Sequence, residues 1–185
     1  RILPSTHLVE NLKNLFATYP IVQGLWNSAK IAVITVVISL LITSLAAYGF
    51  EKFGTRASEK VYGLVLIGMM VPFSALVVPL YKTMAAIGLT NSHWAIILPA
   101  IGSIFLLFFF RQSFKSIPNE ILEAARIDGA SELRIFFQIV FPSMRATYAA
   151  AAIYAFMTSW NNYMWPMVVL NAPSKKTIIL HVAKI

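Results

Sequence analysis

Residues 31–50 read IAVITVVISLLITSLAAYGF, a run of twenty residues without a charge. As an α-helix this run would be about 30 Å long, which matches the hydrocarbon thickness of a bilayer. It lacks the period-two alternation of apolar and polar residues that marks a membrane strand. The run therefore predicts a transmembrane helix and an all-α fold.

Three more apolar runs follow along the chain, at residues 61–81, 94–110 and 146–170. The 185 residues are 58% hydrophobic and 12% charged, whereas soluble domains carry about 25% charged residues. Four such runs cannot all be buried in one small soluble core. We therefore expect residues 1–185 to form a single transmembrane domain, a polytopic helix bundle with four spans and no soluble second domain.

Two prolines, Pro72 and Pro79, interrupt the second run. Proline removes a backbone donor and kinks a helix, and membrane helices tolerate the kink where neighbours or water satisfy the freed carbonyls. The kink is either a packing feature or a break beside a transport path.

Basic residues are unevenly divided among the loops, and this predicts the orientation of the bundle. Loop 82–93 holds only Lys82, whereas loops 51–60 and 111–145 together hold Lys52, Arg56, Lys60, Arg111, Lys115, Arg126, Arg134 and Arg145. Cytoplasmic loops carry the excess of positive charge, so the two basic loops should face the cytoplasm. Both chain ends would then face outward, although they also carry lysines. We expect one further span before Arg1 and another after Ile185.

The loop at 111–145 predicts two short helices joined by a turn. Pro118 suits the first turn of a helix, and Gly129 suits its C-terminal stop. Glu120 and Glu123 lie near the positive N-terminal end of this helix. Ser131 would then cap a second helix.

One side of the first loop helix is small and apolar at its centre. Three-and-four spacing places Ile117, Ile121, Ala124, Ala125 and Asp128 on that side. Small residues let a partner approach the backbone closely, which favours a helix lying in a groove of another protein. A connector helix on the membrane surface would show a similar pattern, so the residues alone leave both interpretations open.

The same loop resembles the EAA motif of permease subunits in ATP-binding-cassette importers. The resemblance rests on Glu123–Ala125, on Gly129 after three intervening residues, and on Ile139 and Pro142. Phe141 stands where the motif has leucine, and this keeps the position apolar. Beyond the loop motif, the chain resembles the carbohydrate-uptake branch, the maltose-permease-like binding-protein-dependent systems, at residues 46–50, 79–81, 88–91, 117–120, 125–130 and 160–161.

This resemblance implies a six-span permease subunit in a bacterial or archaeal cytoplasmic membrane, of which this chain holds four spans. It implies partner ATPase subunits, a second permease subunit, an external solute-binding protein and a sugar or oligosaccharide substrate. An amino acid or a peptide is the nearest alternative solute. It also implies that the loop docks in a cleft of the ATPase and rocks the permease between inward-open and outward-open forms. The residues that would dock are Glu120, Glu123, Ala124, Ala125, Asp128 and Gly129.

Polar residues lie within the fourth run, at Thr158, Ser159, Asn161 and Asn162. Amides in lipid are costly unless paired, so these side chains should face protein or water. They either hydrogen-bond between helices, which we favour, or line a solute path. The candidates for such a path are Trp160, Asn161 and Asn162, with the aromatic ring available to stack on a sugar.

Other classes of protein lack the residues that they need. The chain has no cysteine, which excludes disulfides and thiol chemistry, and no Walker motif, so ATP is bound by another chain. The net charge of +8 comes from short segments beside the apolar runs, and no nucleic-acid partner is expected. His7, His93, His181 and every acidic residue lie outside the predicted spans, which argues against an intramembrane enzyme or an ion-coupled transporter. We expect no catalytic residue, metal or cofactor.

Overall fold

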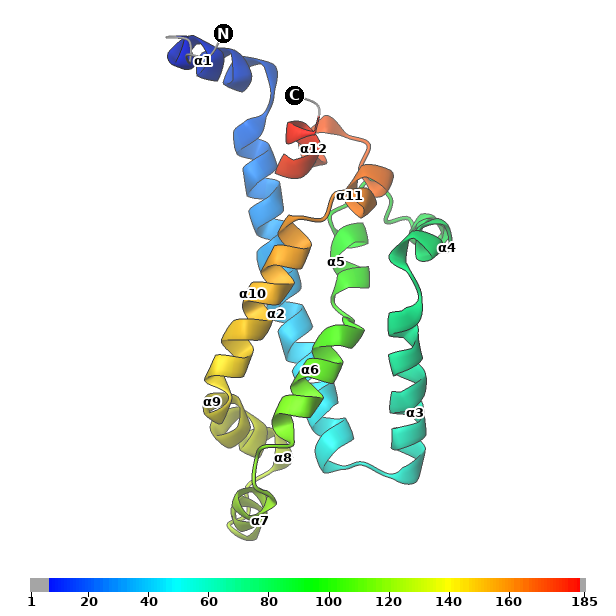
Figure 1. The fold of residues 1–185 in the computed structure, drawn as a ribbon, viewed down its shortest axis with the longest axis vertical. Helices are drawn as coiled ribbons and strands as arrows, with labels where there is room; N and C mark the ends of the chain where they lie inside the picture. The colour runs from blue at the N-terminus through cyan, green and yellow to red at the C-terminus, as the bar shows by residue number, and fades with distance from the viewer. Residues whose placement is uncertain (1–6, 184–185) are drawn as a thin grey trace, which may run out of the picture.

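The computed structural model describes residues 7–183, and these form helices joined by short turns, with no strand in that range. In chain order the elements are α1 (Leu8–Thr18), α2 (Ile21–Lys52), α3 (Arg56–Ile67), η1 (Gly68–Met70), α4 (Phe73–Ala86), α5 (Trp94–Ala100), α6 (Ile104–Phe114), α7 (Asn119–Ile127), α8 (Glu132–Ile135), η2 (Phe136–Val140), α9 (Phe141–Ser143), α10 (Arg145–Trp160), α11 (Met164–Val169), η3 (Pro173–Lys175) and α12 (Ile178–Val182). We call the end that holds α7 and α8 the loop end, and the end that holds α1 and α12 the terminal end (Figure 1).

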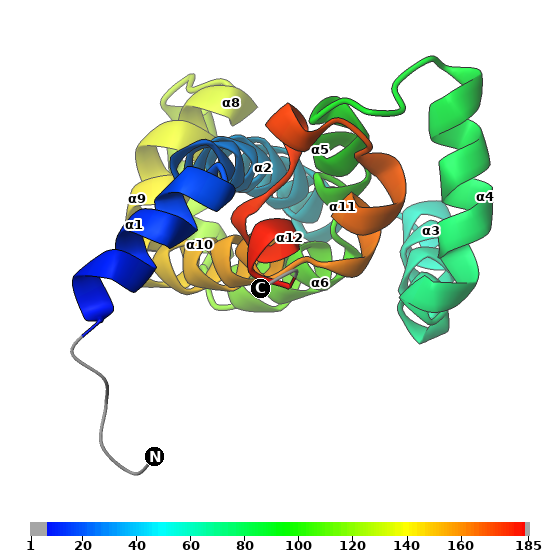
Figure 2. The same cartoon turned by 90° about the horizontal axis from the view of Figure 1, so that it is seen from above.

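The long helix α2 forms the centre of the bundle and contacts α6 and α10 along its length (Figure 1 and Figure 2). Its buried face is made largely of small and hydroxyl-bearing residues, which let neighbouring helices approach closely. The buried residues of this helix are Gly24, Asn27, Ser28, Ile31, Ala32, Thr35, Ser39, Thr43, Ser44, Ala47 and Tyr48.

The 32 residues of α2 exceed the span predicted at 31–50. The extra turns at the terminal end include the polar residues Asn27 and Ser28, whose side chains hydrogen-bond to the chain near α12. Asn27 Nδ2 donates to the carbonyl oxygens of Ser174 at 2.9 Å and Lys176 at 3.0 Å. The backbone N–H of Ile178 donates to Ser28 Oγ at 2.9 Å. Hydropathy alone therefore underestimates the length of α2, because its buried polar residues find hydrogen-bond partners in the protein.

The second apolar run forms a bent pair of helices instead of the single straight span expected at 61–81. The axes of its two parts, residues 56–70 and 73–86, differ by 106°. The break falls at Pro72, whose backbone is extended with ψ of 136° and precedes α4. Proline cannot donate a helical hydrogen bond and restricts the residue before it, which ends α3 and η1 here. Pro79 lies inside α4, which continues past it.

Helices α3 and α4 stand at the side of the bundle (Figure 2). Tyr62 is the buried residue of α3, and Met84 is the buried residue of α4. Most of the apolar surface of this pair therefore faces away from the described core.

Helices α5 and α6 cover the third run and extend it to Phe114. The 21 residues from Trp94 to Phe114 are long and apolar enough to cross a membrane. A turn at 101–103 interrupts them, and Ser103 Oγ begins α6 by accepting from the Leu106 N–H at 3.3 Å. The four residues beyond the predicted end at 110 include Arg111, which is buried and ion-paired.

The fourth apolar run, residues 146–170, is divided where one span was expected. Helix α10 ends at Trp160 after 16 residues, and α11 begins at Met164. Asparagine side chains compete for backbone hydrogen bonds and favour helix ends, which accounts for the break at Asn161 and Asn162. Beyond the break, Trp165 is buried and its Nε1 donates to the Ala95 carbonyl at 2.8 Å.

Two helices in the described range are long and apolar enough to span a membrane, or three if the bent pair counts as one span. They are α2 and the α5–α6 unit, with the α3–α4 pair as the third. The four-span count stays a prediction.

The two basic loops lie together at the loop end, as the charge count predicts for loops on one side of a membrane (Figure 1). Lys52 Nζ joins them directly, donating to the Ile117 carbonyl at 3.1 Å and to Asn119 Oδ1 at 3.0 Å. Arg1 and Lys184, expected at the opposite side, lie outside the described residues.

Candidate functional site

Helix α7 is the outermost element of the loop end (Figure 1). Pro118 precedes it and Glu120 lies in its first turn, where the helix dipole favours a carboxylate. Gly129 ends it with φ of +81°, and the Ala130 N–H then donates to the Ala125 carbonyl at 3.0 Å. Ser131 caps α8. Two short helices and a glycine turn therefore lie at the residues where the sequence predicts them.

The outer side of α7 combines carboxylates with large apolar side chains. Ile127 is 86% exposed and Ile121 is 50% exposed. Of the six predicted docking residues, Ala125 is half-buried, and those that are exposed are Glu120, Glu123, Ala124, Asp128 and Gly129. An exposed apolar stripe rimmed by charge, on a protruding helix, is typical of a protein contact surface.

The face inferred from spacing needs one correction. Ile117 precedes α7 and is only 7% exposed, so it belongs to the core of the bundle and not to the outer face. Leu122, at 1% exposure, anchors the inner face of the helix. The outer stripe therefore runs through Glu120, Ala124 and Ile127. Ile127 was not among the predicted docking residues, although its spacing of three from Ala124 places it on this stripe.

A hydrogen-bonded network fixes the two loop helices against α2. Arg126 Nε donates to Glu132 Oε1 at 2.6 Å, and the Tyr48 hydroxyl donates to Glu132 Oε2 at 3.0 Å. The guanidinium of Arg126 also lies 5.7 Å from the centre of the Phe53 ring. The hydrogen bond from Arg126 lowers the pKa of Glu132, so the carboxylate stays charged at neutral pH. The angle of α7 is thereby tied to the end of the central helix.

A second ionic cluster, which was not predicted from the sequence, connects three helices at the same end. Arg111 of α6 is 7% exposed and donates from Nε to Glu51 Oε2 at 3.1 Å. It also pairs with Glu59 of α3, and its guanidinium lies 4.0 Å from the centre of the Tyr62 ring. A buried arginine requires such partners. The sequence does contain a signal for this cluster, because Glu51, Glu59 and Arg111 border the first three apolar runs on the same side.

The candidate path residues lie around the break between α10 and α11 but do not act as one group. Trp160 is half-buried and stacks on Phe156, with 5.4 Å between ring centres. Asn161 is exposed. Asn162 is half-buried, accepts from the Trp165 N–H at 3.4 Å, and is the member of the three that lines a small polar cavity inside the bundle.

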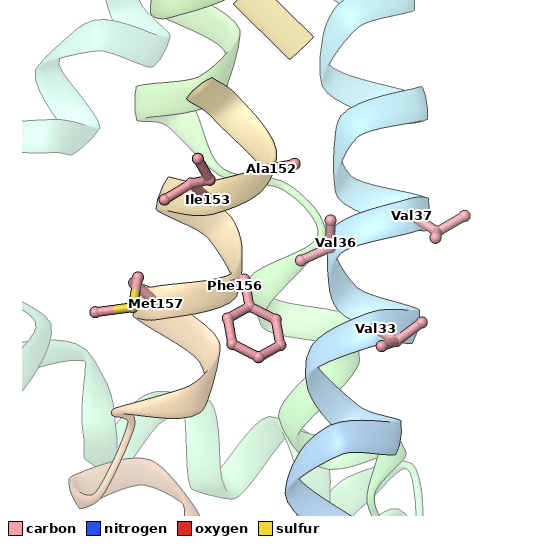
Figure 3. A pocket seen from close by; sticks show the side chains of 7 residues that line it. All are labelled: Val33, Val36, Val37, Ala152, Ile153, Phe156 and Met157. Carbon is pink, nitrogen blue, oxygen red and sulfur yellow. The ribbon is translucent and has the colours of Figure 1, made fainter. Parts of the chain in front are cut away.

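A larger groove between α2 and α10 is apolar and does not suit a hydrophilic solute. It measures about 330 Å³ and is lined by Val33, Val36, Val37, Ala152, Ile153, Phe156 and Met157. In Figure 3, the Phe156 ring lies between the two helices and Val36 points toward it from α2. These side chains offer contacts to an acyl chain or to another helix, without a hydrogen-bonding group.

No group of three or more metal-ligating side chains occurs within residues 7–183. The described part of the chain thus presents two features for function. These are a protruding helical contact surface at the loop end and a polar cavity among apolar helices.

Apolar helices that are long enough to cross a membrane, with a small polar cavity among them and a protruding helix at one end, are features of a membrane protein. Residues 39–182 match the family described as binding-protein-dependent transport system inner membrane component. The chain therefore belongs to this family, which favours transport over the intramembrane enzyme considered from the sequence. The match includes α7 and every lining residue of the cavity except Thr35.

Relatives in the same family carry names from sugar and glycerol phosphate uptake. The chain is 47% identical over 180 residues to the lactose transport system permease protein LacG of Rhizobium radiobacter, covering 97% of this chain and 66% of that one. It is 39% identical over 182 residues to the arabinooligosaccharides transport system permease protein AraQ of Halalkalibacterium halodurans, covering 97% and 65%. It is 31% identical over 175 residues to the sn-glycerol-3-phosphate transport system permease protein UgpE of Escherichia coli (strain K12), covering 91% and 62%.

A solved structure shares the fold. The chain aligns with a TM-score of 0.79 and 28% identity to a chain of a bacterial ABC transporter involved in the import of the acidic polysaccharide alginate. The alignment covers 87% of this chain and 56% of that one. The chain thus spans no more than about two thirds of the length of these relatives.

Proposed function

We propose that this chain is the permease subunit of an ATP-binding-cassette importer for a sugar or an oligosaccharide. The observation that carries the proposal is the exposed face of α7. It protrudes from a family-matched transport bundle and is held to the end of α2 by Arg126, Glu132 and Tyr48.

The exposed face of α7 is the site where a partner ATPase docks. Its apolar stripe would be buried in a cleft of that partner, and Glu120 and Glu123 would lie at the rim. Because Glu132 links α8 to Tyr48, a displacement of the loop helices is passed to α2 and then to α6 and α10, which pack on it. ATPase closure would in this way shift the bundle between inward-open and outward-open forms.

The remaining parts of the assembly follow from the family. The loop end faces the cytoplasm, and the terminal end faces an external solute-binding protein. A second permease subunit completes the path, and the chain spans the bacterial or archaeal cytoplasmic membrane several times. The exposed apolar surfaces of α3 and α4 are available to lipid, to further spans or to that second subunit.

A carbohydrate is the favoured solute because the 47%-identical relative is named for lactose and the 39%-identical one for arabinooligosaccharides. The relative named for sn-glycerol-3-phosphate is less similar, at 31%. An amino acid or a peptide is the alternative, and no relative reported above is named for either.

The test is transport by the full-length subunit, purified with its ATPase, second permease and solute-binding protein, in proteoliposomes. We expect uptake of labelled lactose or arabinooligosaccharide that requires ATP and the binding protein. A complex with an inactive ATPase is the matched control. Uptake that persists without ATP, or that stops when an ion gradient is collapsed, would contradict the proposal.

A further inference from the structure

A polar cavity of about 80 Å³ lies inside the bundle, among α2, α5, α6 and α10. Besides Tyr154, six of its lining residues carry hydroxyl or amide groups and are uncharged. They are Thr35, Ser39, Ser103, Thr158, Ser159 and Asn162. No Asp, Glu, Lys, Arg or His lines it. The cavity is therefore equipped to bind a neutral hydrogen-bonding group and not an ion.

Two of the hydroxyls in its wall have no partner. Thr35 is 3% exposed and Ser39 is 1% exposed, and neither Oγ1 of Thr35 nor Oγ of Ser39 makes a hydrogen bond. A buried hydroxyl left unpaired costs about 1–3 kcal/mol, so such groups normally have a partner in the protein or in a bound molecule.

The same helix shows how a hydroxyl avoids this cost when no ligand is involved. Thr43, also 3% exposed, donates to the Ser39 carbonyl one turn earlier at 2.6 Å. Thr83 does the same to the Pro79 carbonyl at 2.9 Å, and Ser113 to the Phe109 carbonyl at 2.9 Å. Donation to the preceding turn is thus the common solution in these helices, and the two cavity hydroxyls depart from it.

The cavity also lies where two apolar runs are interrupted. The turn at 101–103 contributes Ser103 to its wall, and the break after α10 contributes Asn162. Interrupted helices inside a membrane bundle are tolerated where they line a cavity, and in transporters they mark solute-binding sites. The breaks and the unpaired hydroxyls are independent observations that point to the same place.

Its size limits what it holds. A cavity of this size has room for a few waters or for one hydroxymethyl group of a sugar. Tyr154, which also lines it, is 41% exposed and packs on Phe105 with 4.3 Å between ring centres. An aromatic surface therefore adjoins the hydroxyl cluster, as a sugar with one apolar face requires.

We propose that this cavity binds one hydroxyl or hydroxymethyl group of the transported sugar, with Thr35 and Ser39 as specificity-determining residues of this subunit. The inference rests on the proposed function. In the absence of sugar, water supplies the same hydrogen bonds, and the experiment separates these two sources.

The experiment measures uptake of lactose and of its monodeoxy derivatives by the complete complex in proteoliposomes. The variants are Thr35→Val and Ser39→Ala, which remove one hydroxyl each with little change in shape. Thr43→Val is the matched control, because Thr43 is equally buried on α2 but already has a partner. Thermal stability of each purified complex without sugar is the second readout.

We expect wild type to discriminate several-fold against one monodeoxy-lactose, and Thr35→Val or Ser39→Ala to raise the KM for lactose about 2- to 10-fold and to abolish that discrimination. Stability without sugar should be nearly unchanged in these two variants, since each hydroxyl then bonds only to water and not to another part of the protein. Thr43→Val should leave the KM and the discrimination unchanged.

Two results would overturn the proposal and leave the sugar importer intact. One is unchanged discrimination in both cavity variants, which would assign the cavity to water or to packing. The other is a loss of stability without any change in KM, which would make both hydroxyls structural. A wild-type complex that takes up no sugar at all would refute the proposed function and this site with it.

Discussion

The hydroxyl of Tyr48 donates a 3.0 Å hydrogen bond to Glu132 Oε2, across 84 residues of sequence, and joins the loop end of α2 to the first turn of α8. Tyr48 is 4% exposed, whereas the Glu132 side chain is 40% exposed and also receives Arg126. A buried donor on the central helix thus meets a carboxylate on the surface loop. With the hydrogen bond from Lys52 to Asn119, this contact is one of the links that join α2 to the loop helices.

The Tyr48→Phe substitution should uncouple the loop from α2. It removes only the hydroxyl, and a hydrogen bond to a charged group contributes about 1.5–3 kcal/mol. We expect a lower melting temperature and fewer solute molecules transported per ATP hydrolysed, with the ATPase still bound. Both are measured on the purified complex in proteoliposomes. Tyr81→Phe, on α4, is the control; an equal effect of that change would show that the result is not specific to the loop contact.

The contribution of Glu132 to the stability of the folded protein should decrease at low pH. The hydrogen bond from Arg126 lowers its pKa below the ordinary value of 4.5. A carboxyl with a depressed folded-state pKa stabilises the protein above its unfolded pKa, and this stabilisation is lost as pH falls through the folded pKa. The stability difference between wild type and Glu132→Gln should therefore be constant from about pH 7 to about pH 5 and shrink below about pH 4. Thermal unfolding of the two proteins across this range measures it, and a difference that already vanishes near pH 6 would contradict the assignment.

Orientation can be tested by cysteine labelling, since the chain has no native cysteine. A cysteine replacing Ile87, which is 55% exposed in the turn after α4, should react with an impermeant thiol reagent in intact cells. A cysteine replacing Asn119 at the loop end should react only after the membrane is made permeable. Gly88 is avoided because its φ of +71° disfavours any side chain. The reverse labelling pattern would invert the proposed topology.

The two asparagines after α10 should behave differently from each other. Asn162 lines the polar cavity and accepts from the Trp165 N–H, whereas Asn161 is exposed and outside the cavity wall. We expect Asn162→Ala to raise the KM for uptake several-fold and Asn161→Ala to change it by less than about twofold. Loss of complex assembly in Asn162→Ala, without a separable effect on uptake, would instead support the helix–helix bonding role favoured by the sequence.

The parts of the fold that the sequence predicts best are those set by local chemistry. Pro118, Gly129 and Ser131 place the ends of the loop helices, because each acts on its own turn of backbone. The apolar runs likewise locate the helices. Their limits are less predictable, since Asn27 and Ser28 extend α2 only through bonds to residues about 150 positions away.

Contacts between residues distant in sequence also explain why the burial of Ile117 and the polar cavity could not be predicted from the sequence. The docking face inferred from spacing included Ile117, which is buried under the loop by the core of the bundle. The cavity was not predicted, because Thr35 and Ser39 read as ordinary polar residues in an apolar run. Only the packing of four helices shows that their hydroxyls are unpaired.

The surface of α7 can be tested by reversing one charge on it. Glu123 is exposed in the second turn of α7. Glu123→Lys should leave the permease folded but weaken its co-purification with the ATPase and lower uptake, because a cation replaces a carboxylate on the proposed docking surface. Lys115 is exposed just before α7 but lies outside this surface, so Lys115→Glu is the matched control for a charge reversal. Equal ATPase binding by both variants and wild type would remove α7 as the docking element.

The strongest test of the loop concerns Gly129, because the structure offers a second glycine with nearly the same geometry at the other end of the bundle. Gly129 has φ of +81° and Gly88 has φ of +71°, and a Cβ at either would meet no atom within 4 Å. An added Cβ therefore meets no clash at either position, and the main cost of valine should be backbone strain of about 1–2 kcal/mol. Gly88→Val should lower stability modestly and leave ATPase binding intact. Gly129→Val should lower stability by a similar amount, yet weaken co-purification of the ATPase and abolish uptake, because the turn sets the angle between α7 and α8. Asparagine tolerates the left-handed conformation, so Gly129→Asn should restore much of the ATPase binding and much of the uptake. If Gly129→Val and Gly88→Val reduce transport equally, the strain acts through general stability and the loop does not couple the permease to its ATPase.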